Sequence, residues 1–352
     1  MLAVSARMRT RRRSRAAWAG IVLCGLWLAV GSYGVVTYIH RYWVHRGFPP
    51  PVTPAGVPRG RLATVSFFSR SLGHRETYLV YTPPGYQGLS RAGRRFPVLY
   101  LLHPPPGRPD VYVQAGAINV RSDILVHSGR IRRMILVMPY ATTGRFGNDT
   151  EWANTRAGAY ESFLIDLVHE VDHRFATLRN RRDRGLAGLS EGGYGAINVG
   201  LHHLGLFSVL ESWSGYFTQT PTQPFAGASA AALAANSPSQ YVGSLAARIR
   251  KLGLRTYLYQ GVKDEIRPWR IRQFAGQLAA AGAYVRWGFF PGGHDWGLWR
   301  RQTPHMLMVA SDWFSHSPRI HPRSPLKGIG HPEHPRAGKP HHHKLGLFEV
   351  TA

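Results

Sequence analysis

A serine lies between two glycines in the segment Gly188-Leu189-Ser190-Glu191-Gly192, which follows the pattern Gly-x-Ser-x-Gly. An apolar, strand-like run precedes this segment, and a helix-like run begins near Gly192. Glycines beside such a serine let neighbouring backbone pass without a Cβ clash, so the serine can occupy the tip of a sharp turn. A helix N-terminus also favours developing negative charge. We therefore predict that Ser190 is a nucleophile; the alternative is a structural glycine-rich turn.

A serine nucleophile needs a base, and the base needs a carboxylate that orients it. His294 follows the last strand-like run through a Pro-Gly-Gly loop and precedes an amphipathic helix, which favours it as the base. Asp264 comes just past the strand-like run 254–260, and the adjacent Glu265 is the alternative acid. The predicted triad is therefore Ser190, Asp264 and His294, in that order along the chain.

The elements that must position this triad alternate along residues 61–314. The clearest helix is 160–175, where apolar residues recur at helical spacing, and 271–281 and 306–314 look similar. The alternation predicts one three-layer α/β domain with a mostly parallel sheet and helices on both faces. The predicted strands are 62–69, 77–81, 97–103, 134–139, 185–189, 209–212, 254–260 and 284–290.

With these residues in place, the stretch from about 62 to 314 resembles the esterase D family of α/β-hydrolases. The family includes feruloyl esterases, S-formylglutathione hydrolase and the exported mycolyltransferases. The resemblance implies an α/β-hydrolase fold, with Ser190 as nucleophile, Asp264 as acid and His294 as base. In the mycolyltransferases the acid is a glutamate, which keeps Glu265 open. The matching stretches are PVLYLLHPPPG, MILVMPY, GLSEGGYGA, GVKDE and PGGHDWGLW.

The resemblance also implies an oxyanion hole, formed by the Glu191 amide and a backbone N–H just beyond the third strand. There the family typically has His-Gly or Asp-Gly, whereas this chain has His103-Pro104-Pro105-Pro106-Gly107. In the family register the donor falls on Pro105, which has no N–H. Loss of one donor typically costs about 100- to 1000-fold in kcat. Either Gly107 or Arg108 donates instead, or another side chain substitutes, or catalysis is weak.

Two further residues are candidates to line the substrate pocket. Glu151 and Trp152 follow the fourth predicted strand, on the same side of the sheet as the triad. The alternative is that they only brace their loop. The segment 218–241 is a candidate cover for the site, because loops there commonly set specificity. We expect the Glu191 side chain to face solvent in the first helical turn.

The charge of the chain first suggests a nucleic-acid binder. Lys and Arg number 44 against 18 Asp and Glu, a net charge of +26. However, six arginines lie in residues 1–15, ahead of an uncharged apolar segment, 16–39, that is long enough to span a bilayer. This bias predicts a cytoplasmic N-terminus and an exported body. We therefore expect no nucleic-acid partner, and an ester-containing small molecule or an anionic envelope lipid or polymer instead.

The predicted organisation has five parts. They are a basic cytoplasmic N-terminus (1–15), a transmembrane signal anchor (16–39), a Pro-rich stalk (40–60), the esterase domain (61–314) and a disordered His-, Pro- and Lys/Arg-rich tail (315–352). The alternative to an anchor is a cleaved signal peptide, which would make the protein secreted. The single cysteine, Cys24, excludes an intrachain disulfide and a cysteine-based metal cluster. Neither a P-loop nor a dinucleotide fingerprint occurs in the right context, so we expect no cofactor and no metal.

The sequence thus predicts a single-pass, membrane-anchored, extracytoplasmic serine esterase or acyltransferase that acts on a carboxylic ester. The alternative is a non-catalytic or weakly active envelope scaffold or binding protein on a hydrolase fold.

Overall fold

The computed structural model describes residues 2–105, 108–141, 149–265, 268–315 and 347–350. The chain divides into two units, residues 1–50 and residues 51–352.

The first unit is one long helix, α1 (Leu2–Ile39), which continues as a π-helical turn, η1 (His40–Val44). Residues Trp18–Val44 are long and apolar enough to cross a membrane by length and composition, and a signal sequence would pass the same test. Large apolar side chains in this stretch are exposed, such as Trp27 at 76%. The apolar helix is therefore present, and its membrane topology remains a prediction.

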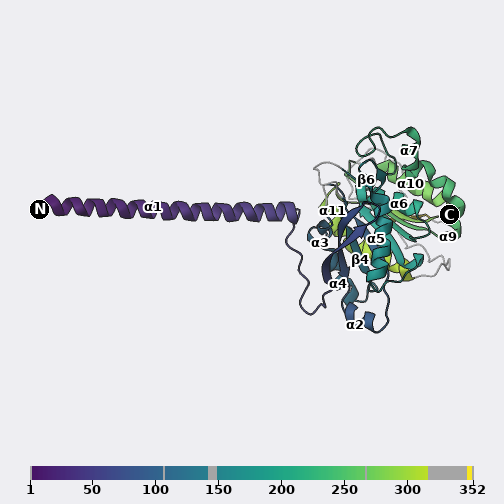
Figure 1. The fold of residues 1–352 in the computed structure, drawn as a ribbon, viewed down its shortest axis with the longest axis horizontal. Helices are drawn as coiled ribbons and strands as arrows, with labels where there is room; N and C mark the ends of the chain where they lie inside the picture. The colour runs from purple at the N-terminus through teal and green to yellow at the C-terminus, as the bar shows by residue number, and fades with distance from the viewer. Residues whose placement is uncertain (1, 106–107, 142–148, 266–267, 316–346, 351–352) are drawn as a thin grey trace, which may run out of the picture. The chain divides into compact units, whose positions relative to one another are not determined.

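The second unit is built on a nine-stranded sheet (Figure 1) in the order β1-β2-β4-β3-β7-β8-β9-β10-β11. Strands β4, β3, β7, β8, β9 and β10 run parallel, whereas β1, β2 and β11 are antiparallel additions at the two edges. The bounds are β1 Arg61–Ser69, β2 His74–Thr82, β3 Val98–Leu102, β4 Ile135–Pro139, β7 Arg184–Leu189, β8 Val209–Trp213, β9 Arg255–Gly261, β10 Tyr284–Phe290 and β11 Leu347–Val350.

Helices connect these strands and cover both faces of the sheet. A small hairpin, β5 (Asn154–Thr155) with β6 (Gly158–Ala159), directly precedes helix α5. The α-helices are α2 Tyr86–Arg91, α3 Asp110–Gln114, α4 Ile118–His127, α5 Tyr160–Arg174, α6 Glu191–His202, α7 Ala230–Ala235, α8 Pro238–Tyr241, α9 Ala246–Leu252, α10 Pro268–Ala280 and α11 Trp296–Ser315. Short 3-10 turns lie at η2 Arg181–Asp183 and η3 Val242–Leu245.

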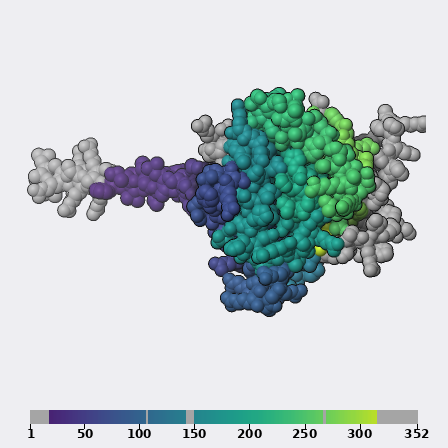
Figure 2. All heavy atoms as spheres, turned by 45° about the vertical axis from the view of Figure 1, so that its right-hand side comes forward, coloured from purple at the N-terminus to yellow at the C-terminus, as the bar shows by residue number. Residues whose placement is uncertain are grey.

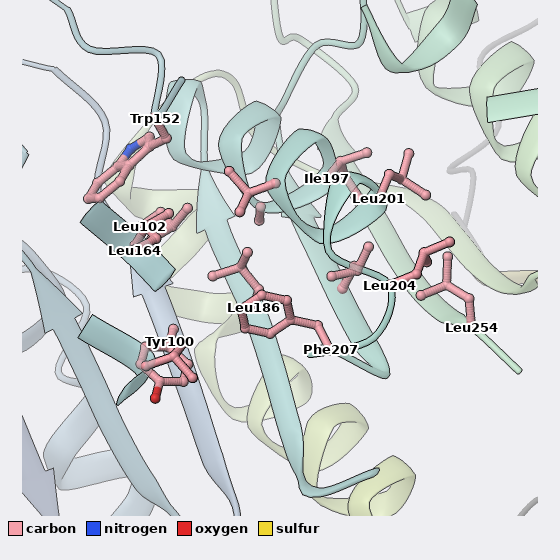
Figure 3. Close-up of a cluster of buried hydrophobic side chains, with 14 of the residues drawn as sticks. Tyr100, Leu102, Trp152, Leu164, Leu186, Ile197, Leu201, Leu204, Phe207 and Leu254 are labelled. Atoms are coloured by element: carbon pink, nitrogen blue, oxygen red, sulfur yellow. The ribbon is translucent and has the colours of Figure 1, made fainter. Parts of the chain in front are cut away.

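The alternation of side chains along each strand creates two separate cores. On β3, Val98, Tyr100 and Leu102 face one cluster with α5, α6 and α10, whereas Leu99 and Leu101 face the other with α3, α4 and α11. Figure 3 shows the first cluster, where strand residues such as Leu186 lie against α6. A central strand buried on both faces is typical of parallel sheets. The predicted three-layer α/β architecture with a mostly parallel sheet is therefore confirmed.

All eight predicted strands are present, and the predicted helices correspond to α5, α6, α10 and α11. The sequence did not predict the short helices, the β5–β6 hairpin or β11. Strand β11 pairs antiparallel with β10, so the expectation of a disordered tail is wrong for residues 347–350. The physical reason is that β10 would otherwise leave its backbone groups unpaired at the sheet edge. Residues 316–346 lie outside the described residues.

The end of the predicted stalk makes hydrogen bonds to α4, although its Pro- and Gly-rich composition predicts an extended segment. Asp123 on α4 is buried and accepts hydrogen bonds from the Thr53 hydroxyl at 3.3 Å and the Gly60 amide at 2.8 Å. Its Oδ1 also accepts from the Tyr81 hydroxyl at 2.8 Å. Thr53 and Gly60 of the predicted stalk are therefore held to α4 by hydrogen bonds.

Within the second unit, α2 and α7 mark opposite ends in both Figure 1 and Figure 2. The segment around α2 forms the lower end in these views, and the segment around α7 forms the upper end.

The carboxyl ends of β7, β9 and β10 lead into the loops that carry the three predicted triad residues.

Candidate active site

Ser190 lies on a sharp turn between β7 and α6. Its backbone has φ 55° and ψ −120°, a conformation that residues with a Cβ rarely adopt. The Ser190 amide donates to the Trp213 carbonyl at 2.8 Å, and the Tyr194 amide donates to the Ser190 carbonyl at 3.0 Å. These two bonds fix the turn from both sides, which is the strained geometry that a nucleophile elbow requires.

The two flanking glycines are sterically required. A Cβ on Gly188 would overlap the backbone of Gly192, and a Cβ on Gly192 would overlap the carbonyl of Leu102 at the end of β3. The elbow therefore packs directly on the neighbouring strand, with no room for a side chain on either glycine.

His294 reaches the elbow from the loop after β10. Its Nε2 lies 2.9 Å from Ser190 Oγ, and its Nδ1 lies 3.1 Å and 3.0 Å from the two carboxylate oxygens of Asp264. Because Nδ1 faces only acceptor oxygens, it carries the proton, and Nε2 is left to accept from the serine hydroxyl. Three residues far apart in sequence thus form one connected chain of hydrogen bonds.

Backbone hydrogen bonds bring the acid and base loops together. The Val262 amide donates to the Phe290 carbonyl at 3.0 Å, and the Lys263 amide donates to the Gly292 carbonyl at 2.9 Å. A Cβ on Gly261 would overlap the Gly292 carbonyl, so this close approach needs glycine. Asp264 follows with its side chain fully buried, whereas Glu265 is exposed. The carboxylate in contact with His294 is therefore that of Asp264.

Two neighbouring residues, Asp295 and Trp299, hold His294 in place. Asp295 accepts from the Gly293 amide and the Leu298 amide, both at 2.9 Å, which fixes the loop at the start of α11. The Trp299 ring packs edge-on to the His294 ring at 5.0 Å, and its Nε1 donates to the Ser214 hydroxyl at 3.2 Å. An aspartate just before a predicted helix is a capping signal that could have identified Asp295.

The predicted oxyanion donors are only partly described. The Glu191 amide is the first of α6 and, among the described residues, donates no backbone hydrogen bond, so it is available to a ligand. Pro105 is exposed and has no N–H, and Gly107 lies outside the described residues. One donor can therefore be placed beside Ser190.

The expectation that the Glu191 side chain faces solvent is wrong. Glu191 is 5% exposed, and its Oε1 accepts from the Glu151 amide at 2.7 Å and the Thr150 hydroxyl at 3.2 Å. Burial, with the nearby charges of Glu151 and Asp149, raises the pKa of the Glu191 carboxyl well above its ordinary value. The segment 149–152 therefore covers the first turn of α6.

Glu151 and Trp152, the two pocket candidates, make bracing contacts. The Glu151 carboxylate accepts from the Tyr216 hydroxyl at 2.6 Å and from Gln219 Nε2 at 2.9 Å. Burial raises the pKa of Glu151 to about 7. Trp152 is fully buried, and its Nε1 donates to the His103 carbonyl at 3.1 Å. These contacts fit the alternative in which both residues brace the loop.

His103, at the start of the Pro-rich loop, is neutral and held at both ring nitrogens. Its Nε2 accepts from the Ala141 amide at 3.1 Å, so its Nδ1 carries the proton and donates to the Pro104 carbonyl at 3.1 Å. Burial lowers the pKa of His103 to about 4, which agrees with an uncharged ring. The beginning of this loop is therefore tied to the end of β4.

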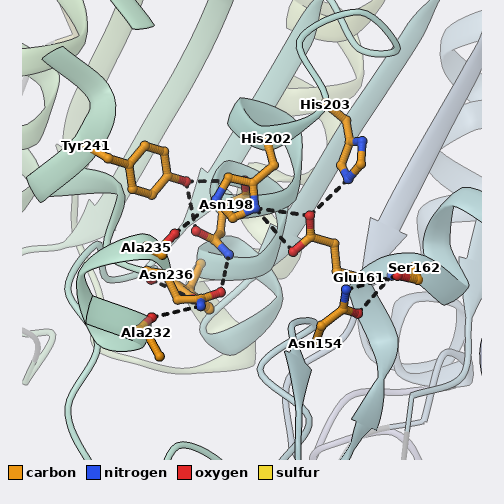
Figure 4. A network of polar contacts seen from close by, with 11 residues as sticks. Asn154, Glu161, Ser162, Asn198, His202, His203, Ala232, Ala235, Asn236 and Tyr241 are labelled. Carbon is orange, nitrogen blue, oxygen red and sulfur yellow. Dashed lines mark hydrogen bonds and ion pairs between the residues drawn. The ribbon is translucent and has the colours of Figure 1, made fainter. Parts of the chain in front are cut away.

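The segment after β8, the candidate cover, is fastened to α6. The Tyr194 hydroxyl donates to the Asn236 carbonyl at 2.8 Å, one turn after Ser190. Near the other end of α6, His202 contacts both Glu161 of α5 and the Ala235 carbonyl, as Figure 4 shows. Residues 235–236 are therefore held to α6 at two points.

Comparison with known proteins agrees with this geometry. The profile of the family described as "Putative esterase" matches residues 69–309. An endo-1,4-beta-xylanase/feruloyl esterase of Xylanibacter ruminicola is 33% identical over 141 residues, which cover 39% of this chain and 19% of that protein. The chain thus matches about a fifth of the length of this relative.

Solved structures of esterases share the fold. A ferulic acid esterase aligns with a TM-score of 0.63 and 24% identity, covering 73% of this chain and 99% of that chain. An S-formylglutathione hydrolase from Staphylococcus aureus aligns with a TM-score of 0.59 and 16% identity, covering 72% and 99%. The family profile spans more than half of the chain, and the structural matches agree with it. The chain therefore belongs to this esterase family.

Proposed function

We propose that this protein is a serine esterase, or an acyltransferase, that cleaves a carboxylic ester through an acyl-enzyme at Ser190. The observation that carries the proposal is the chain of hydrogen bonds from Ser190 Oγ to His294 and on to Asp264. Family membership and the strained turn at Ser190 support it.

In the proposed mechanism, His294 Nε2 takes the hydroxyl proton as Ser190 Oγ attacks the ester carbonyl. Asp264 holds the ring in the tautomer with its proton on Nδ1 and stabilises the imidazolium that forms. The Glu191 amide donates to the oxyanion of the tetrahedral intermediate. The imidazolium then protonates the leaving alcohol. Water, or an acceptor hydroxyl in a transferase, then attacks the acyl-enzyme. His294 takes the proton of this second nucleophile and returns a proton to Ser190 Oγ, which leaves as the acyl group is released.

The test is hydrolysis of a short p-nitrophenyl ester by the full chain in detergent, with Ser190→Ala as the matched variant. Methyl ferulate belongs in the same assay, because feruloyl and ferulic acid esterases are among the similar proteins. Turnover by the parent chain and its loss in Ser190→Ala support the proposal. Equal turnover by the two proteins would exclude it.

A second candidate function, a non-catalytic envelope scaffold or binding protein on this fold, is favoured by one observation. Pro105 stands where the resemblance implies an oxyanion donor, and it has no N–H. This candidate predicts an intact triad with no measurable ester turnover. The same assay therefore separates the two.

We further propose that the protein is anchored in a membrane by Trp18–Val44, with the second unit on the extracytoplasmic side. The apolar helix and the arginines ahead of it support this topology. Its proposed partners are an ester-containing small molecule or an envelope lipid or polymer, and no nucleic acid. Protease added outside spheroplasts should degrade the second unit; complete protection in intact spheroplasts would contradict the topology.

A further inference from the structure

The residue after the nucleophile has its carboxyl inside the protein. Glu191 Oε1 accepts two hydrogen bonds, from the Glu151 amide at 2.7 Å and the Thr150 hydroxyl at 3.2 Å. A buried carboxyl is costly unless it is hydrogen-bonded, so this contact must be made whenever the second unit is folded. It joins the first turn of α6 to a loop 40 residues earlier in the chain.

That loop needs an external tether. Glu151 and Trp152 both have φ 50°, in the left-handed region that is unfavourable for residues with a Cβ. Two such residues in succession persist only where surrounding contacts hold them. The amide that Glu191 accepts belongs to the first of the two, so its carboxyl fixes the strained turn directly.

The turn passes this constraint on to the loop after β3. Trp152 Nε1 donates to the His103 carbonyl at 3.1 Å, and the two rings pack edge-on at 5.1 Å. The Trp152 side chain also lies against α6, where a Cβ on Gly195 would collide with it. Figure 3 shows Trp152 beside α6 and Leu102, the last residue of β3. His103 is the first residue of the Pro-rich loop, and a Cβ on Gly192 of the elbow would lie 3.0 Å from its carbonyl oxygen.

We propose that Glu191 is a positioning residue for the oxyanion hole. Its carboxyl oxygen ties the turn at 150–152 to α6 and so holds the Glu191 amide, and the start of the His103 loop, in the geometry that catalysis needs. The proposal rests on the proposed esterase function. Pro105 has no N–H, so the Glu191 amide is the one oxyanion donor that we place beside Ser190 among the described residues.

In this proposal the Glu191 side chain acts as a hydrogen-bond acceptor. Two variants of similar size test that role, because one keeps the acceptor oxygen and the other removes it. Glu191→Gln keeps an oxygen for the Glu151 amide and the Thr150 hydroxyl, whereas Glu191→Met removes it. The raised pKa of Glu191 means that an uncharged amide is a close match to the native group. A simple volume or packing role would leave the two variants alike.

Kinetics of the full chain in detergent on a p-nitrophenyl ester, normalised to folded protein, are the first readout. We expect Glu191→Gln to keep kcat within about threefold of the parent, and Glu191→Met to lower it by about 100-fold with little change in KM. Equal losses in both variants, or no loss in Glu191→Met, would overturn the proposal.

The second readout does not depend on activity. Hydrogen exchange of the Trp152 indole N–H, assigned by NMR with Trp152→Phe, should be at least about tenfold faster in Glu191→Met and unchanged in Glu191→Gln. If the parent chain had no esterase activity, the proposed function would fail while this measurement still decided the positioning role. Unchanged exchange in Glu191→Met would overturn the positioning role even in an active esterase.

Discussion

Both carboxylate oxygens of Asp264 lie close to Nδ1 of His294, at 3.1 Å and 3.0 Å. The Asp264 side chain is fully buried, whereas that of His294 is 30% exposed. Asp264 therefore contacts the His294 ring from the protein interior, and the Nε2 of His294 is oriented toward Ser190. Asp264 is proposed here as the third member of the triad, and the exposed Glu265 is the natural control.

Replacing this acid should leave the protein folded and nearly inactive. Asp264→Asn keeps the shape of the side chain but offers an N–H to Nδ1, which favours the wrong tautomer of His294. We expect kcat to fall by about 10⁴-fold, with little change in KM. Glu265→Gln should change kcat by less than about threefold. Rates measured on a p-nitrophenyl ester check both, and a larger loss in Glu265→Gln than in Asp264→Asn would assign the acid to Glu265.

The elbow should not tolerate a methyl group on its second glycine. In Gly192→Ala the new Cβ would overlap the Leu102 carbonyl, so the turn must shift and carry Ser190 with it. We expect a loss of at least about 100-fold in kcat, with about 1–3 kcal/mol lost from the free energy of unfolding. Gly276→Ala, within α10 and with open space around it, should instead stabilise by roughly 0.5–1 kcal/mol and leave the rate unchanged. Full activity in Gly192→Ala would contradict the packing described for the elbow.

The hold on residues 235–236 should depend on pH through His202 (Figure 4). Its Nδ1 lies 3.0 Å from Glu161 and its Nε2 lies 3.0 Å from the Ala235 carbonyl, so both nitrogens must donate and the ring is charged. Burial by itself would lower the pKa of His202, but the bonds to Glu161 outweigh it and raise the pKa. This stabilisation is therefore complete below the unfolded pKa of about 6.5 and is lost as the pH rises through the folded pKa.

We accordingly expect the Tm difference between the parent chain and His202→Gln to be several degrees at pH 6 and smaller at pH 9. His169→Gln, an exposed histidine on α5, is the control and should show no such trend. Thermal unfolding followed by circular dichroism measures both. A Tm difference that grows toward pH 9 would rule out the charged ring.

Glu151 should make the fold less stable as the pH rises. Burial raises the pKa of this carboxyl to about 7, above its unfolded value of about 4.5. Between these two pH values the unfolded chain has released the proton and the folded chain still holds it, so stability falls as the pH increases. Glu151→Gln should reduce the drop in Tm between pH 5 and pH 7.5 by about 3 °C or more. An unchanged drop would mean that Glu151 does not titrate in this range.

Much of this architecture could be predicted from the sequence, because each main signal is local. Apolar runs identified the eight strands that residues 61–314 contribute to the large sheet, and the segment around Ser190 contains its own strand, turn and helix signals. Asp264 and His294 each follow a predicted strand. The order of Ser190, Asp264 and His294 along the chain then indicated that the three residues form a triad. The parallel sheet then brings these strand ends to one edge, which no single motif states.

Several contacts that the sequence did not predict join segments far apart in the chain. Glu191 is buried because the segment around Glu151 folds over it, and nothing beside Glu191 in sequence indicates this. Asp123 looks like an ordinary helix residue until Thr53 and Gly60 are seen to bond to it. Strand β11 lies in a stretch of unremarkable composition, and its order comes from pairing with β10.

The central claim, that Ser190 is a nucleophile activated by His294, is tested most directly by a fluorophosphonate probe on the full chain in detergent. Mass spectrometry of the digested protein should find the probe on Ser190. Labelling should slow by at least about 100-fold in His294→Ala and be absent in Ser190→Ala. Probe attached at another residue, or a chain that resists labelling while folded, would contradict the claim.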